Sequence, residues 1–262
     1  MKNPLSLSKV LALGSLVALA GSYAGCKEPD SEMYIRGVLS WPTTGDCLLK
    51  ADPDAAQLLE GQLDVGLSNE YRAVLLVANQ LVQTDRAPDE KQRTETSRVS
   101  IHTAEVVLSV PGNCADGLCE VSSFSLPASG AIDNSTGGRP GYGLVYVTLI
   151  DSVTAKKSAG KILTAQVRVY GRALGGQEVR SNDFQFNIRV GSGQLIYFDP
   201  AYDDPLIPGI DCLKDQGSSG GSAALSTTCV LGQDGPTHCA LCAGNNVNCR
   251  CQDPSAAKQC EL

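Results

Sequence analysis

Alternating apolar and polar positions over residues 164–190 give the clearest structural signal in the chain. In the first half of this segment, Val167 and Val169 alternate with polar neighbours. In the second half every other residue is apolar, at Phe184, Phe186, Ile188 and Val190. A period of two places one set of side chains on a buried face and the other in water. Because Gly175-Gly176 allows the positive φ angles of a tight turn, a β-hairpin is predicted here.

Further apolar segments predict more strands. Residues 70–82, "EYRAVLLVANQLV", are almost continuously apolar, which is typical of a central strand. Strands are also predicted, in chain order, over residues 98–110, 122–132, 141–150 and 194–199. Pro127 indicates that the second of these is an edge strand or is interrupted. Residues 54–60 suggest a helical turn or two.

These segments amount to about seven strands between Leu63 and Asp199, without long helical periodicity. They predict a mainly β fold, an antiparallel β-sandwich that is immunoglobulin-like in the broad sense, with a small disulfide-rich C-terminal module. A β-barrel is the alternative. The Cys–Trp–Cys signature of antibody domains is missing, since Trp41 precedes the strand region. Four parts are expected. They are a signal peptide (residues 1–25), a lipidated N-terminus with a tether and entry segment (26–60), a β-sandwich (61–200) and a cysteine-rich C-terminal module (201–262).

The first 25 residues have the organisation of a secretory signal peptide. Lys2 and Lys9 form a basic start, an uncharged apolar run covers residues 10–21, and small residues follow. The run is too short for a permanent transmembrane helix; the alternative is a buried N-terminal helix. Removal of the signal peptide leaves a chain with 19 basic and 28 acidic residues and therefore a formal charge of −9. This acidity argues against nucleic acid as a partner and against electrostatic binding to anionic lipid.

The end of this segment, Ala24-Gly25-Cys26, resembles the bacterial lipoprotein signal, in which small residues precede a cysteine that becomes the lipidated first residue. Tyr23 stands where that signal usually has leucine. The resemblance implies that Cys26 carries a lipid anchor. Lys27 directly after it favours outer-membrane delivery, because in sorting of the enteric type an aspartate there favours retention in the inner membrane. The alternative is ordinary signal-peptidase cleavage, which would leave Cys26 a thiol.

The remaining cysteines predict disulfides. Of 11 cysteines ten remain when Cys26 is set aside, and an even number in an exported chain is typical of a disulfide set: Cys47, Cys114, Cys119, Cys212, Cys229, Cys239, Cys242, Cys249, Cys251 and Cys260. Cys114 and Cys119 bracket a short loop and are predicted to pair. Seven of the others lie in residues 211–262, so Cys47 is expected to bridge to that module. With few large apolar residues, the module depends on cross-links.

The stretch "HCALCAGNNVNCRC" offers an alternative to disulfides. Cys239-x2-Cys242 and Cys249-x-Cys251 look like zinc knuckles, with His238 as a further ligand. The second pair has one intervening residue where zinc knuckles usually have two or more, and the exported compartment favours paired thiols. Disulfides without bound zinc are therefore expected.

Candidates for catalysis or metal binding are few. His102 is out of phase with its apolar neighbours and is expected to face solvent, and His238 is expected in a loop. No nucleophile elbow, HExxH motif or phosphate loop is present, so no catalytic or cofactor-binding residue and no cofactor is predicted. Weak candidates for calcium are four carboxylates, whose spacing matches no EF-hand: Asp199, Asp203, Asp204 and Asp211.

The lipoprotein-like start, the valine-rich β region and the cysteine-rich end together resemble the surface lipoproteins common in myxobacteria and related predatory bacteria. The stretches "YRAVLLVANQLV" and "TETSRVSIHTAEVVL" and the terminal cysteines carry this resemblance. It implies an outer-membrane or cell-surface location. We expect a non-enzymatic binding or structural module, anchored by lipid, with an envelope protein or a polysaccharide as possible partner. The alternatives are a secreted hydrolase with a site scattered over loops and a calcium-dependent adhesion module.

Overall fold

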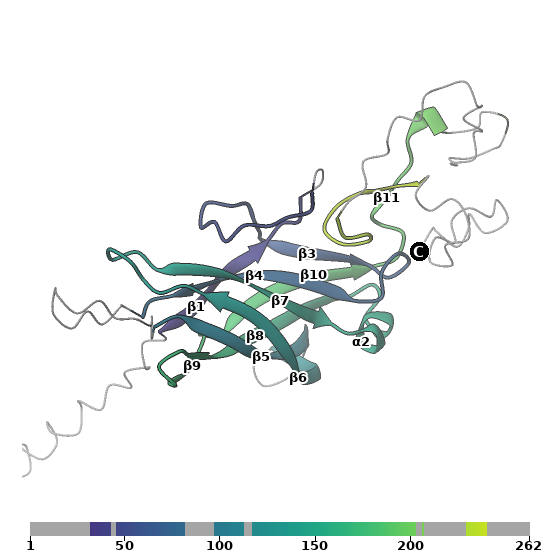
Figure 1. The fold of residues 1–262 in the computed structure, drawn as a ribbon. Coiled ribbons are helices and arrows are strands. Elements are labelled where there is room, and N and C mark those ends of the chain that lie inside the picture. Colours follow the sequence, from purple (N-terminus) through teal and green to yellow (C-terminus); the bar gives the residue numbers. More distant parts are fainter. Residues whose placement is uncertain are drawn as a thin grey trace, which may run out of the picture. The chain divides into compact units, whose positions relative to one another are not determined.

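The computed structural model describes residues 32–42, 46–81, 97–112, 117–202, 206 and 229–239. This part of the chain is mainly β, as predicted (Figure 1). Its strands are β1 (Met33–Leu39), β2 (Gln57–Leu58), β3 (Glu60–Asp64), β4 (Tyr71–Asn79), β5 (Val99–Pro111), β6 (Leu118–Ile132), β7 (Gly141–Ile150), β8 (Ile162–Ala173), β9 (Glu178–Arg180), β10 (Phe184–Gly191), β11 (Ile196–Tyr197) and β12 (Thr237–His238). The helical elements in it are α2 (Ser152–Lys157) and the 3-10 turn η1 (Pro200–Tyr202). Neither of these described helices has the length and apolar character needed to cross a membrane.

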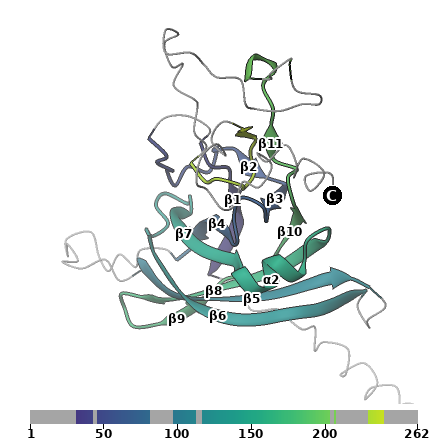
Figure 2. The same ribbon diagram turned by 90° about the vertical axis from the view of Figure 1, so that its right-hand side faces the viewer.

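Most of the strands belong to one large sheet. Its order is β2–β1–β4–β7–β6–β5–β8–β10–β3, with β9 beside β8. The sheet curves until it is nearly barrel-like (Figure 2), and Met33 of β1 forms a bridge to Ser181, just after β9. One prediction needs correction, because β3 and β10 pair in parallel and the sheet is therefore mixed rather than wholly antiparallel. No short hairpin joins these two strands, so nothing forces them to run in opposite directions.

A single large core cluster fills the interior of the sheet, built mainly from Val, Leu, Ile and Ala side chains. Strand β4 contributes Ala73, Leu75 and Val77 to it. The alternate residues Val74 and Leu76 point the other way and are fully buried as well. Burial on both faces explains why this strand is apolar without alternation.

Four predicted strands are confirmed as β4, β5, β6 and β7. Strand β6 pairs with β5 along its length but with β7 only between Ser129 and Tyr146. Most of its second edge thus has no strand partner in the described part of the chain. This agrees with the edge character predicted from Pro127.

The predicted hairpin over residues 164–190 contains three strands. Gly176, with φ of 95°, lies in the tight turn that joins β8 to the short β9. Strand β10 then runs antiparallel to the first half of β8, where Phe184 pairs with Val167. The alternation predicted for β10 is confirmed, because Phe186 and Ile188 are buried.

Three local features differ from the predictions. Residues 54–60 contain no helix. Part of this segment is strand β2, which pairs with β1, and so short a segment does not form a stable helix by itself. The strand predicted over residues 194–199 is only β11, which pairs in parallel with β12 in a separate small sheet. Strand β1 lies within residues 26–60, where no strand was predicted. Its register shifts between Ile35 and Gly37, and this bulge hides the period of two.

Candidate functional site

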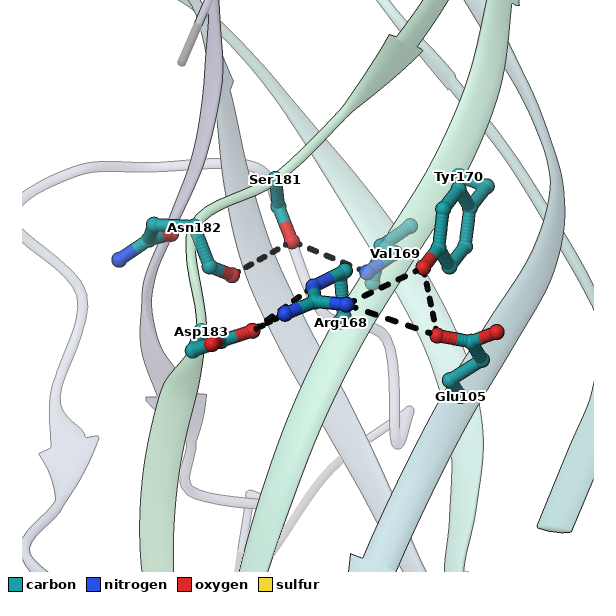
Figure 3. A network of polar contacts seen from close by, with 7 residues as sticks. All are labelled: Glu105, Arg168, Val169, Tyr170, Ser181, Asn182 and Asp183. Carbon is teal, nitrogen blue, oxygen red and sulfur yellow. Dashed lines mark hydrogen bonds and ion pairs between the residues drawn. The ribbon is translucent and has the colours of Figure 1, made fainter. Parts of the chain in front are cut away.

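A network of charged and polar side chains lies on the outer face of β5 and β8 and at the start of β10 (Figure 3). At its centre, Arg168 Nε donates to Asp183 Oδ1 over 2.7 Å. On its other side, Arg168 Nη1 lies 3.4 Å from the Tyr170 hydroxyl, which donates to Glu105 Oε2 over 2.5 Å. The hydrogen bond that Arg168 donates to Tyr170 first, and then that to Asp183, raise the pKa of Arg168. The guanidinium is thus a fixed cation held between two carboxylates.

The backbone before β10 is fixed by its own hydrogen bonds, and this positions Asp183. Ser181 Oγ accepts from Val169 N and donates to the carbonyl of Asn182, each over 2.9 Å (Figure 3). Asn182 Oδ1 in turn accepts from Ile35 N over 3.0 Å. Strands β1, β8 and β10 therefore hold the network together, although they are far apart in the sequence.

His102 occupies a β-bulge beside this network. The register of β5 shifts between Ile101 and Thr103 against both neighbouring strands, so His102 is an extra residue and both it and Thr103 reach the outer face. Its exposure confirms the prediction that it faces solvent. His102 Nδ1 lies 2.9 Å from Thr103 Oγ1, and Nε2 lies 3.3 Å from Glu178 Oε2. Hydrogen bonds from Arg172 first, and then from His102, lower the pKa of Glu178.

This hydroxyl, imidazole and carboxylate have the order of a nucleophile, its base and an orienting acid. Of the three, His102 and Glu178 line an open depression of about 540 Å³ on the β8–β9 turn, together with residues that include Ser100, Arg172 and Leu174. The side chains of His102 and Glu178 are 50% and 56% exposed. Water at such a site weakens the electrostatic stabilisation on which hydrolysis depends. The arrangement suits binding better than catalysis.

Of the calcium candidates only Asp199 is among the described residues; Asp203, Asp204 and Asp211 lie outside them. Asp199 Oδ1 accepts from Ala201 N over 2.9 Å, and Oδ2 lies 3.7 Å from His238 Nε2. The described ranges contain no group of three or more acidic, histidine or cysteine side chains that could hold a metal ion. Calcium binding therefore stays the weaker alternative that it was, because three of its four candidate residues lie outside the described ranges.

One disulfide ties the start of the chain to its end. Cys47 is bonded to Cys229, which is the link predicted between Cys47 and the C-terminal module. Cys119 and Cys239 are disulfide-bonded too, so the thiolate of Cys239 is not available to zinc. The other cysteines lie outside the described residues, and with them the lipidation of Cys26 and the predicted pairing of Cys114: Cys26, Cys114, Cys212, Cys242, Cys249, Cys251 and Cys260.

Residues 229–239 are also held against β3 and β4 by polar contacts, most of them partly buried. The Tyr71 hydroxyl donates to Asp234 Oδ2 over 2.9 Å, and Gln62 N donates to Oδ1 over 2.8 Å. Burial raises the pKa of Asp234, and burial together with the nearby carboxylate raises the pKa of Tyr71 well above its usual value. Gln233 exchanges two hydrogen bonds with the backbone of Arg72. Asp234 has a positive φ and lies in the segment for which the sequence indicated only cross-links, so sequence reasoning missed this contact.

A buried carboxylate, that of Asp64, stabilises the same end of the sheet. Its Oδ1 accepts from Gly66 N and Gly193 N, each over 2.9 Å, and its Oδ2 accepts from Leu195 N over 3.0 Å. The residue is fully buried. Three donors replace the water that the carboxylate loses, so its role is structural.

Neither a protein-family model nor a curated protein sequence matches this chain. The function is therefore argued from its own residues. The described part of the chain presents a pre-organised polar face around Arg168 and an open histidine site on the same sheet. Both are surfaces that a large partner can reach.

Proposed function

We propose that this protein is a lipid-anchored protein of the bacterial cell envelope, at the outer membrane or cell surface, and acts there as a non-enzymatic binding module. The export signal and Cys26 support the location. The resemblance to myxobacterial surface lipoproteins points the same way. The observation that carries binding rather than catalysis is the Arg168 network, in which side chains on an open face are fixed in advance.

A fixed network suits a protein partner in the envelope. Ordering a long side chain on binding costs about 0.5–1.5 kcal/mol, and Arg168 is ordered already by Asp183 and Tyr170. Arginines at the centre of an interface are often the residues on which its affinity depends. Glu105 and Asp183 on either side supply complementary charge, which favours specificity.

Replacing Arg168 with methionine tests this surface. The variant keeps an unbranched apolar side chain but loses the cation, so capture of the envelope partner should fall about tenfold or more, as for a central interface arginine. The measurement is a quantitative pull-down from solubilised envelope with the full lipidated protein as bait. Arg139→Met is the control, because Arg139 is exposed in the β6–β7 turn and outside the network. Equal capture by both variants would count against this face.

Replacing Cys26 with alanine tests the anchor. Without a thiol to lipidate, the protein should leave the membrane fraction and lose palmitate labelling completely, because the acyl chains are its proposed membrane contact. Tyr23→Leu is a matched control that brings the signal closer to the lipoprotein pattern and should keep the label. Palmitate incorporation that persists in Cys26→Ala would refute the lipoprotein hypothesis.

We also propose that the curved sheet acts as a β-sandwich, immunoglobulin-like in the broad sense, over residues 61–200 with β1 added. One layer is β2–β1–β4–β7 and the other β6–β5–β8–β10–β3. The support is the single register pair between β6 and β7, which joins the layers only loosely. The cysteine-rich module after residue 200 remains a proposal as well.

A second candidate function is hydrolysis, and one observation favours it. Thr103, His102 and Glu178 have the hydrogen-bond order of a general-base site. It ranks second because the base and its carboxylate are half exposed and border an open depression. A catalytic site needs donors fixed in a water-excluded environment.

A further inference from the structure

Four aromatic side chains gather on the outer face of β1, β4 and β7, opposite the core: Tyr34, Trp41, Tyr142 and Tyr146. The inward residues of β7 are Val145 and Val147, so Tyr146 between them and Tyr142, four positions before Tyr146, point outward. Ala78 pairs with Tyr34 on one side and Tyr142 on the other, and its small side chain leaves room for two rings. Further along the strand, Tyr146 contacts Trp41 with ring centroids 6.3 Å apart.

Two polar side chains lie among these rings, and the backbone is shaped to place them there. Arg36 is exposed at the bulge in β1, and its guanidinium lies 5.9 Å from the centroid of the Tyr142 ring. Gly37 follows, and a Cβ at that position would lie 2.3 Å from Gln57 Oε1. Only glycine therefore lets the Gln57 amide lie against the sheet. The four aromatic residues together with Arg36 and Gln57 are called the aromatic face.

Two groups of the aromatic face have no partner of the kind they need: the Arg36 guanidinium has no carboxylate, and the Trp41 indole N–H has no acceptor, among the described residues. None of its six residues is acidic, and no carboxylate of the described residues forms an ion pair with Arg36, although the whole chain has a net charge of −7. The indole N–H of Trp41 is buried without an acceptor in the described residues. A partner that supplies an anion would neutralise Arg36, whereas the Trp41 N–H is covered and lies out of reach of a ligand on the surface.

From these contacts we infer that the aromatic face binds an acidic polysaccharide. Sugar rings have apolar C–H faces that stack on Tyr146, Trp41 and Tyr142, and hydroxyl groups that bond to amides and phenols. A sugar carboxylate pairs with Arg36, since a guanidinium binds carboxylates through two parallel hydrogen bonds. Tyr142 and Tyr146 are four residues apart on one strand, about 13 Å, so the face spans several sugar units rather than one. The inference rests on the proposed location in the envelope and names a surface separate from the Arg168 network.

The single tryptophan of the chain is Trp41, so its fluorescence reports on this face without a label. The experiment titrates the full protein with polygalacturonate and, in parallel, with uncharged dextran. Polygalacturonate should change the fluorescence in a saturable manner that weakens with salt, and dextran should bind more weakly. No saturable change with polygalacturonate overturns the inference.

Variants locate the binding. Tyr146→Ala should weaken polygalacturonate binding about tenfold, and Arg36→Gln should remove most of the preference over dextran. The matched control is Tyr197→Ala, because Tyr146 and Tyr197 are 50% and 51% exposed and Tyr197 lies in the separate small sheet. Thermal unfolding checks that each variant is folded, and isothermal calorimetry provides a readout besides Trp41. Equal loss in Tyr146→Ala and Tyr197→Ala overturns the inference.

Two further measurements separate this proposal from others. Arg168→Met should bind polygalacturonate as the wild type does, so failure of the Arg168 face as a protein-binding surface leaves this result unchanged. Sedimentation without polysaccharide tests a different occupant, a second copy of the chain. If the wild type dimerises and Tyr146→Ala is monomeric, the aromatic face is a self-association surface and the polysaccharide proposal is wrong.

Discussion

Replacing Asp64 with alanine is expected to lower the free energy of unfolding by about 3–5 kcal/mol. The carboxylate is fully buried and accepts from the backbone N–H groups of Gly66, Gly193 and Leu195. Alanine leaves these three donors without a partner, and each buried unsatisfied N–H costs about 1–3 kcal/mol before the site relaxes or admits water. The measurement is denaturant unfolding of the full protein under non-reducing conditions.

Two companion variants make this result specific. Asp64→Asn keeps one acceptor oxygen but turns an amide N–H₂ toward at least one backbone donor, so its loss should be intermediate. Asp52→Ala is the control, because Asp52 is exposed and, among the described residues, its carboxylate accepts from Asp54 N alone, in a local turn. Its effect should stay within about 0.5 kcal/mol. If Asp64→Ala and Asp52→Ala cost the same, the buried carboxylate does not stabilise this end of the sheet.

Removing the Cys47–Cys229 disulfide is expected to cost about 2–5 kcal/mol. The bridge joins residues 182 positions apart, and a cross-link that closes a long loop restricts the unfolded chain most. The double variant Cys47→Ala with Cys229→Ala avoids a free thiol. Besides the lower midpoint of denaturation, residues 229–239 should become more protease-sensitive, because one end of the segment loses its covalent tie and depends more on contacts such as that between Tyr71 and Asp234.

The strands should survive this change, because their shared core does not include the bridge. Far-ultraviolet circular dichroism should therefore stay close to that of the wild type. The predicted pair Cys114 and Cys119 provides the comparison, since a cross-link over so short a loop should contribute less. A larger loss from the short loop than from the long one would contradict the loop-length explanation.

Local periodicity explains how much of the fold could be predicted. Strands β4, β5, β7 and β10 follow from apolar runs and alternation, and the exposure of His102 follows from its phase relative to Ile101. Where a bulge shifts the phase, as at Arg36 in β1, the alternation disappears from the sequence and the strand was missed. Strand β3 was missed for another reason, because the five residues from Glu60 to Asp64 are too few to show a period.

The candidate sites show the same division. The sequence marked His102 as exposed, but its contacts with Thr103 and Glu178 depend on a bulge and on a neighbouring hairpin. The network of Arg168 and Asp183 was visible only as polar positions on strands. Any half-exposed sheet has such positions, so the pattern alone could not identify a surface.

The sequence by itself determined the mainly β class, the positions of the long strands and the expectation that Cys47 bonds to the C-terminal segment. These follow from the period of a strand and from the count and location of the cysteines. Only the tertiary structure decided the strand order, the parallel pairing of β3 with β10, the buried role of Asp64 and the contact of Asp234 with Tyr71. The physical reason is that periodicity reports only the face on which a side chain lies. Strand pairing and the partners of buried acceptors depend on which distant segments of the chain meet. Closing a longer loop costs only a little more free energy than closing a short one, so the distance between two segments in the sequence does not reveal whether they meet.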